Sequence, residues 1–211
     1  MCRLDCNTYT PYYCITKTIK NMELIGLQGG IGSYNDTAIR YYLGTDYSSK
    51  KISYLDSTPN VFLALNKNEI ECGQFAVYNN KSGLYQESLD SITINTFKVI
   101  DIYDIPINHA LMVHKNQSLK NISKIITHKE VVKQCRKKIN EKYHNLDLEF
   151  TSGKLIDPAT IASKIVSEDE FFEVCVIGNP LLAEINNLKV IDLDLSNDKD
   201  SRSTFFLVKK E

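Results

Sequence analysis

The sequence predicts an α/β fold, and three observations lead to this prediction. Strand-like and helix-like segments alternate along most of the chain. Helix-start signals stand between the strand-like runs, as at Asp157-Pro158, where an acidic N-cap precedes proline at the first helical position. The 211 residues, 43% of them hydrophobic, can bury roughly 70% of their extended surface, enough for one compact unit or two small lobes. The alternation favours mainly parallel strands joined by right-handed crossovers.

The elements follow from local patterns taken in chain order. Short apolar or alternating runs predict strands at 23–27, 51–55, 73–78, 96–104, 108–114, 123–127, 147–151, 173–177, 188–193 and 203–209. Apolar residues at helical spacing predict helices at 34–43, 58–67, 84–92, 129–143, 157–167 and 179–186. The helix at 129–143 is strongly amphipathic, because its Lys and Arg residues fall mostly opposite its apolar ones.

Composition narrows the class of protein. Lys and Arg total 25 against 26 Asp and Glu, so the formal net charge is −1 and nothing favours nucleic acid or an anionic membrane as a partner. No apolar stretch approaches the ~20 residues that span a bilayer. We therefore expect a soluble, cytoplasmic protein that handles a small molecule.

The N-terminal segment 1–21 stands apart from the rest of the chain. It holds Cys2, Cys6 and Cys14, but neither zinc-like ligand spacing nor the long apolar core of a secretory signal. We expect a leader that is disordered or not translated. The other cysteines lie among apolar residues and are expected to be reduced core thiols.

The most informative segment is the glycine-rich turn at 29–34, which reads GGIGSY. It follows an apolar strand-like stretch and precedes a helical pattern that begins near Tyr34. A strand, a glycine turn and a helix start together leave backbone N–H groups where an anion can bind. Taken alone, the same residues also suit an ordinary helix cap.

Three further segments follow, and the four together resemble the motifs of one family. Residues 76–90 read AVYNNKSGLYQESLD, residues 127–135 read THKEVVKQC and residues 204–206 read TFF. In order and spacing they resemble the prephenate dehydratase motifs, which are G-x-x-G-S/T-Y/F, P-x-E-N-S-x-x-G-x-V-x-x-x-L-D, S-H-x-x-A-x-x-Q-C and T-R-F. The resemblance runs from about Met22 to the C-terminus.

This resemblance implies two α/β lobes arranged as in type-2 periplasmic binding proteins, with the ligand in the cleft between them. The first lobe is expected to comprise about 22–102 together with 188–211, and the second about 103–187. Family members usually continue into an ACT domain that binds phenylalanine. We expect none here, because the chain stops directly after the last motif.

The resemblance also implies a set of site residues. Thr204 stands at the threonine of T-R-F, which implies a catalytic hydroxyl. The expected substrate-binding residues are Gly32, Ser33, Tyr34, Asn79, Asn80, Gly83, His128 and Phe205. His128 could donate a proton near neutral pH, or it could cap the following helix. No metal and no cofactor is expected, and the other histidines match no motif.

The chain departs from the family motifs at several positions. Ala76 replaces the proline and Tyr78 the glutamate of P-x-E-N-S, while Asn80 replaces its serine. Phe205 stands at the arginine of T-R-F and removes a fixed fork of donors. These departures suggest a pocket that still takes a prephenate-like ligand but handles its proton and hydroxyl differently.

Three functions remain open. The leading interpretation is a non-aromatising prephenate decarboxylase that yields a dihydro-4-hydroxyphenylpyruvate for secondary-metabolite biosynthesis. The first alternative is a prephenate dehydratase that yields phenylpyruvate for L-phenylalanine without feedback control, which the retained Thr204 favours. The second is a non-catalytic protein that binds a small carboxylate. The family also suggests a homodimer.

Overall fold

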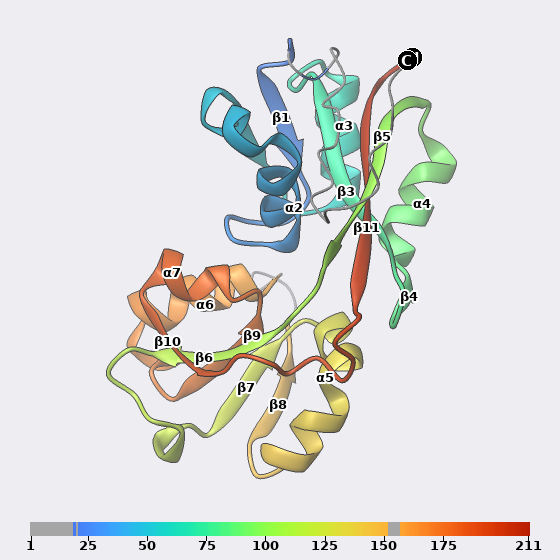
Figure 1. The fold of residues 1–211 in the computed structure, drawn as a ribbon. Coiled ribbons are helices and arrows are strands. Elements are labelled where there is room, and N and C mark those ends of the chain that lie inside the picture. Colours follow the sequence, from blue (N-terminus) through green and yellow to red (C-terminus); the bar gives the residue numbers. More distant parts are fainter. Residues whose placement is uncertain (1–18, 20, 152–156) are drawn as a thin grey trace, which may run out of the picture.

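The structure, a computed structural model, describes residues 19, 21–151 and 157–211 and confirms the α/β prediction. Two sheets, each with helices on both faces, form two lobes one above the other (Figure 1). Every predicted strand and helix has a counterpart within a few residues. The predicted leader 1–21 lies almost entirely outside the described residues.

The first sheet has the strand order β2-β1-β3-β11-β5, and β4 pairs with β3. Its strands are β1 (Leu24–Leu27), β2 (Lys51–Tyr54), β3 (Cys72–Asn79), β4 (Gly83–Leu84), β5 (Phe97–Pro106) and β11 (Arg202–Lys210). Helix α2 (Tyr34–Leu43) buries Ile39 and Leu43 against one face. Helices α3 (Thr58–Asn66) and α4 (Gln86–Ile94) cover the other face.

The second sheet has the order β10-β6-β9-β7-β8. Its strands are β6 (Ala110–His114), β7 (Lys124–Thr127), β8 (Asp147–Phe150), β9 (Val174–Gly178) and β10 (Leu188–Asp192). Helix α5 (Lys129–Lys142) packs on one face, and α6 (Pro158–Ser167) and α7 (Leu181–Asn186) pack on the other. Short 3-10 turns occupy Gly44–Ser49, Leu119–Asn121 and Asp169–Phe171.

The chain crosses between the sheets twice, and these crossings correct two expectations. Strand β10 pairs with β6, so 188–192 belongs to the second sheet and not to the first lobe. Strand β5 keeps pairing with β11 as far as Pro106, so the first sheet extends past the expected boundary at 102. The strands β5 and β11 lie side by side and reach towards the second lobe (Figure 1).

Both sheets are mixed, whereas the alternation of elements favoured mainly parallel strands. The pairs β1–β2, β1–β3, β7–β8 and β7–β9 are parallel, but β11 is antiparallel to both β3 and β5, and β6 is antiparallel to both β9 and β10. In the first sheet the cause is the return of the chain, because β11 re-enters that sheet from the second lobe.

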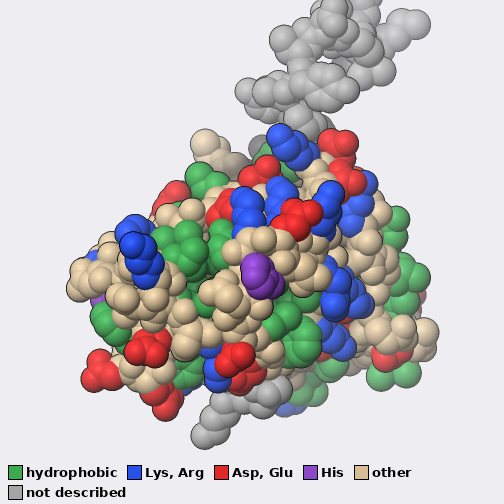
Figure 2. All heavy atoms as spheres, turned by 90° about the horizontal axis from the view of Figure 1, so that it is seen from below, with side chains coloured by type: hydrophobic (Ala, Val, Ile, Leu, Met, Phe, Trp, Pro, Cys, Tyr) green, Lys and Arg blue, Asp and Glu red, His purple; other side chains and the backbone are tan. Residues whose placement is uncertain are grey.

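The surface and the core agree with the composition. On the face seen in Figure 2, Lys and Arg side chains are interspersed with Asp and Glu. Within the described part of the chain, no helix combines the length and the apolar character needed to cross a membrane. Cys72, Cys135 and Cys175 are buried free thiols, as expected.

Candidate active site

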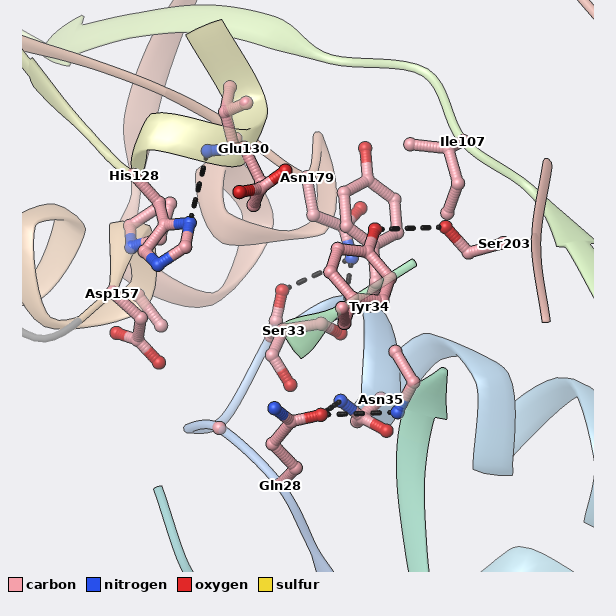
Figure 3. A pocket seen from close by; sticks show the side chains of 18 of the residues that line it. Gln28, Ser33, Tyr34, Asn35, Ile107, His128, Glu130, Asp157, Asn179 and Ser203 are labelled. Atoms are coloured by element: carbon pink, nitrogen blue, oxygen red, sulfur yellow. Dashed lines mark hydrogen bonds between the residues drawn. The ribbon is translucent and has the colours of Figure 1, made fainter. Parts of the chain in front are cut away.

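A cavity of about 330 Å³ lies between the two lobes. The first lobe contributes the glycine turn, the start of α3, Tyr85 and the end of β11 that carries Ser203. The second lobe contributes the starts of α5 and α6 together with Asn179. In Figure 3, His128, Glu130 and Asp157 approach the space from one side and Gln28 and Asn35 from another.

The cavity lies at the N-termini of four helices. The N-cap residues of α2, α3, α5 and α6 all line it, namely Ser33, Ser57, His128 and Asp157. Each cap accepts a backbone N–H from its own first turn, over distances of 3.3, 3.4, 3.2 and 2.8 Å respectively. Helix N-termini carry partial positive charge, so their convergence favours an anionic ligand.

The charged side chains of the lining are acidic. They are Asp56, Glu87, Glu130 and Asp157, and the lining includes no Lys or Arg among the described residues. Each of the last three already has partners, since Glu87 accepts from Thr58 N, Glu130 pairs with Lys133, and Asp157 caps α6. An anion here would therefore be bound by helix ends, hydroxyls and amides. No group of three metal-ligating side chains occurs in the described part of the chain.

The glycine turn lines the cavity as predicted, but most of its N–H groups are engaged. The N–H of Gly30 donates to Asp157 across the cleft at 3.1 Å, and that of Gly32 donates to Asp36 at 2.9 Å. The Ser33 N–H donates to Gly30 O at 3.1 Å. What the turn can offer a ligand is thus the Ser33 hydroxyl and those N–H groups at the first turn of α2 that Ser33 does not already accept.

Asn179 ties the second lobe to this turn. Its Nδ2 lies 3.1 Å from Gly32 O, 3.3 Å from Ser33 O and 2.6 Å from Thr37 Oγ1. Gly32 has φ +80°, and a Cβ there would lie 2.6 Å from the Leu182 side chain. The two lobes are therefore in close contact at the N-terminus of α2. This contact encloses the cavity on that side.

Thr204 does not line the cavity, whereas Ser203 does. The Thr204 hydroxyl donates to Asp104 Oδ1 at 2.8 Å, on the opposite side of β11. Because side chains alternate along a strand, Ser203 and Phe205 share the inner face. The motif T-R-F therefore corresponds to Ser203-Thr204-Phe205, one residue earlier than the sequence suggested. Ser203 supplies the hydroxyl and Phe205 the aromatic ring on the inner face. Phe205 then stands at the phenylalanine of that motif.

The three predicted residues of the second motif lie outside the cavity lining. Asn79 is fully buried, and its Nδ2 donates to Ser203 Oγ at 3.0 Å and to Ser201 Oγ at 3.2 Å. Its Oδ1 accepts the N–H groups of Lys81 and Ser82, which fixes the orientation of the amide. Asn79 therefore supports Ser203 without lining the cavity.

Asn80 and Gly83 also lie outside the lining. The Asn80 side chain is exposed and binds the backbone of Asp200 and Arg202, which holds β11 to the β3–β4 hairpin. Gly83 occupies the hairpin with φ +87°.

His128 caps α5, which is one of the two roles that the sequence left open to it, and its side chain also lines the cavity. Its Nδ1 accepts the Glu130 N–H at 3.2 Å, which assigns the proton of the neutral ring to Nε2. Burial lowers the pKa of His128 below its usual range, so the ring is neutral at pH 7 and can serve as a hydrogen-bond donor.

Sequence reasoning missed a buried network beside the cavity. His109 is almost fully buried, with Nε2 3.1 Å from Gln134 Oε1 and Nδ1 3.4 Å from the Tyr34 hydroxyl. The Tyr34 hydroxyl donates to Asn108 O. Burial lowers the pKa of His109 to about 4, so this histidine is neutral and holds the Tyr34 ring. These residues are far apart in the sequence and come together only in the fold. Because His109 matched no motif, the sequence carried no signal for this network.

The fold and the site define a two-lobed α/β protein with a small-molecule cavity between its lobes. The family model for prephenate dehydratase matches residues 25–211. The chain belongs to the prephenate dehydratase family.

Curated relatives agree with this assignment. A prephenate dehydratase of Methanocaldococcus jannaschii is 26% identical over 181 residues, which cover 85% of this chain and 62% of that protein. A bifunctional chorismate mutase/prephenate dehydratase of Buchnera aphidicola is 23% identical, with 89% of this chain and 49% of that protein covered. The chain thus spans between about half and three-fifths of the length of these relatives.

Solved structures share the fold. The prephenate dehydratase of Arthrobacter aurescens in complex with L-Phe superposes with a TM-score of 0.75 at 20% identity, covering 89% of this chain and 60% of that one. The quorum-quenching acylase GqqA gives 0.72 at 18% identity, with coverages of 90% and 64%. At these identities the likeness concerns the fold alone.

Proposed function

We propose that this chain converts prephenate to phenylpyruvate, with loss of CO2 and water. The observation that carries the proposal is the Ser203 hydroxyl, which lines a cavity at the N-termini of four helices. Prephenate carries two carboxylates, which suit such helix ends, and a ring hydroxyl, which needs a proton in order to leave. The names of the curated relatives support the same reaction.

The reaction divides into binding and proton delivery. The carboxylates would bind at the first turn of α2 and at the facing helix starts of the second lobe, where desolvated dipoles favour negative charge. The bond from the ring to its carboxylate breaks, its electron pair completes the aromatic ring, and the C–O bond to the hydroxyl breaks. Ser203 would donate its proton to the departing oxygen, because Asn79 already donates to Ser203 Oγ and leaves the serine hydrogen free to point inward.

A non-aromatising decarboxylase, the leading interpretation of the sequence, is the second candidate. It rests on the departures from the family motifs, of which Ala76 lies in the cavity wall and donates its N–H to Gln28 Oε1 at 3.1 Å. Proline, which the family motif has at this position, could not make that bond. However, Tyr78 and Asn80 lie outside the cavity lining, and the inner hydroxyl is kept at Ser203. The geometry therefore favours the dehydratase.

The test is the product formed from prephenate. The full chain is incubated with prephenate at pH 8, beside a sample without protein, and the products are analysed by ultraviolet absorption and mass. We expect phenylpyruvate. A non-aromatic keto acid heavier by one water would establish the decarboxylase instead. Unchanged prephenate that nevertheless raises the melting temperature of the protein would indicate a binding protein.

A further inference from the structure

Tyr85 brings a second hydroxyl to the place where the reaction needs a proton. It aligns with the valine of the family motif P-x-E-N-S-x-x-G-x-V, so the motif itself has no polar group there. In this chain the Tyr85 side chain lines the cavity beside Ser203. Tyrosine at this position adds a hydroxyl group to the cavity wall that valine would not supply. We therefore ask what this hydroxyl can do in the reaction.

The backbone fixes the position of Tyr85. Its N–H donates to Val77 O at 3.0 Å, and its carbonyl accepts the N–H groups of Ser88 and Leu89 at the start of α4. The backbone of the residue is therefore anchored between β3 and α4, and this fixes the point from which its ring enters the cavity.

The hydrogen bonds around Ser203 allow an arrangement in which the serine hydrogen faces the ligand. Tyr85 Oη lies 3.3 Å from Ser203 Oγ, and Asn79 Nδ2 lies 3.0 Å from the same oxygen. Asn79 can only donate there, because its Oδ1 is occupied by two backbone N–H groups. If Tyr85 also donates, Ser203 Oγ accepts twice and its own hydrogen is directed to the ligand.

We propose that Tyr85 and Ser203 form a concerted two-proton relay to the leaving hydroxyl of the substrate, an inference that rests on the proposed function. As the C–O bond of the substrate breaks, the Ser203 proton moves to the departing oxygen and the Tyr85 proton moves to Ser203 Oγ. The product side then holds CO2, water, phenylpyruvate and a Tyr85 phenolate, which takes a proton back from solvent. One external proton is consumed in each turnover, as the conversion of a dianion to a monoanion, CO2 and water requires.

The protonation state of Tyr85 is compatible with this relay. Burial raises the pKa of Tyr85, so the phenol remains protonated at neutral pH and is available as a donor. The departing oxygen develops towards hydroxide, whose conjugate acid has a pKa of about 16, whereas the ordinary pKa of a phenol is about 10, so a phenol is the stronger acid. Tyr85 acts through Ser203, and its role is to supply the proton and to orient the serine.

The test compares Tyr85→Phe and Tyr85→Val with Tyr41→Phe as a matched control. Tyr41 lies on α2, is 47% exposed and is not in the cavity lining. For prephenate, we expect kcat of both Tyr85 variants to fall about 100-fold with KM changed less than about twofold, because the loss concerns proton transfer. The control should match the wild type.

The second readout uses the wild-type protein, so it does not depend on a variant that folds. Rates in mixtures of H2O and D2O should curve with the deuterium fraction, because two protons move together, whereas Tyr85→Phe should give a straight line. A kcat within about twofold of the wild type for Tyr85→Phe, or a linear wild-type plot, would overturn the relay and leave the dehydratase proposal standing. A wild-type protein without turnover would remove both.

Discussion

Gly32 offers the sharpest test of how the two lobes meet. Its φ of +80° disfavours any side chain, and a Cβ there would lie 2.6 Å from Leu182 and 2.9 Å from Ile185 of the second lobe. The backbone strain of alanine at such a φ costs about 1–2 kcal/mol. Overpacking against the buried Leu182 adds about 1–3 kcal/mol. Gly32→Ala should therefore lower the free energy of unfolding by about 2–5 kcal/mol.

Gly83 provides the matched control, because its φ is +87° but nothing lies within 4 Å of the position a Cβ would take. Gly83→Ala should cost only the strain, about 1–2 kcal/mol. Urea unfolding followed by circular dichroism measures both variants, and KM for prephenate should rise in Gly32→Ala alone. If the two variants were equally destabilised, the close lobe contact at Gly32 would be refuted.

Two further predictions concern buried polar groups. Because the pKa of His109 falls to about 4 in the folded protein against about 6.5 unfolded, unfolding takes up a proton between these values. Up to ~3 kcal/mol of stability, full above pH 6.5, should be lost as the pH falls towards 4. Urea midpoints measured across this pH range should fall less in His109→Asn than in the wild type. The exposed control His144→Asn should behave like the wild type. An equal dependence of the midpoint on pH in all three proteins would contradict this prediction. Asn179→Ala removes the Asn179 Nδ2 donor from the buried Gly32 carbonyl, whereas the Ser33 carbonyl keeps the Thr37 N–H at 3.0 Å, so the variant should lose about 1–3 kcal/mol of unfolding free energy and raise KM for prephenate. An unchanged KM would show that this contact between the lobes does not shape the site.

Local patterns in the sequence predicted the elements well, because each one depends on nearby residues. The helix predicted at 34–43 is found at Tyr34–Leu43, and Asp157 caps α6 as expected. Strand partners depend on residues far along the chain, so the strand at 188–193 was correctly predicted as a strand and wrongly placed in the first lobe. The tight β4 hairpin was missed because Gly83–Leu84 is too short to show alternation.

The site was predicted in part. The glycine turn and His128 line the cavity because each begins a helix after a strand, which the sequence reveals. Thr204 was chosen by residue type, and a shift of one residue along a strand reverses the face. The signal for Ser203 was present in the alternation of Ser203, Phe205 and Leu207, which are all buried.

The measurement that tests the account most directly is a comparison of Ser203→Ala with Thr204→Ala, using prephenate. The two hydroxyls are neighbours in sequence, but only Ser203 lines the cavity. We predict that kcat falls at least about 100-fold in Ser203→Ala and stays within about twofold of the wild type in Thr204→Ala. The reverse result, with Thr204 essential and Ser203 dispensable, would contradict the assignment of the cavity as the active site.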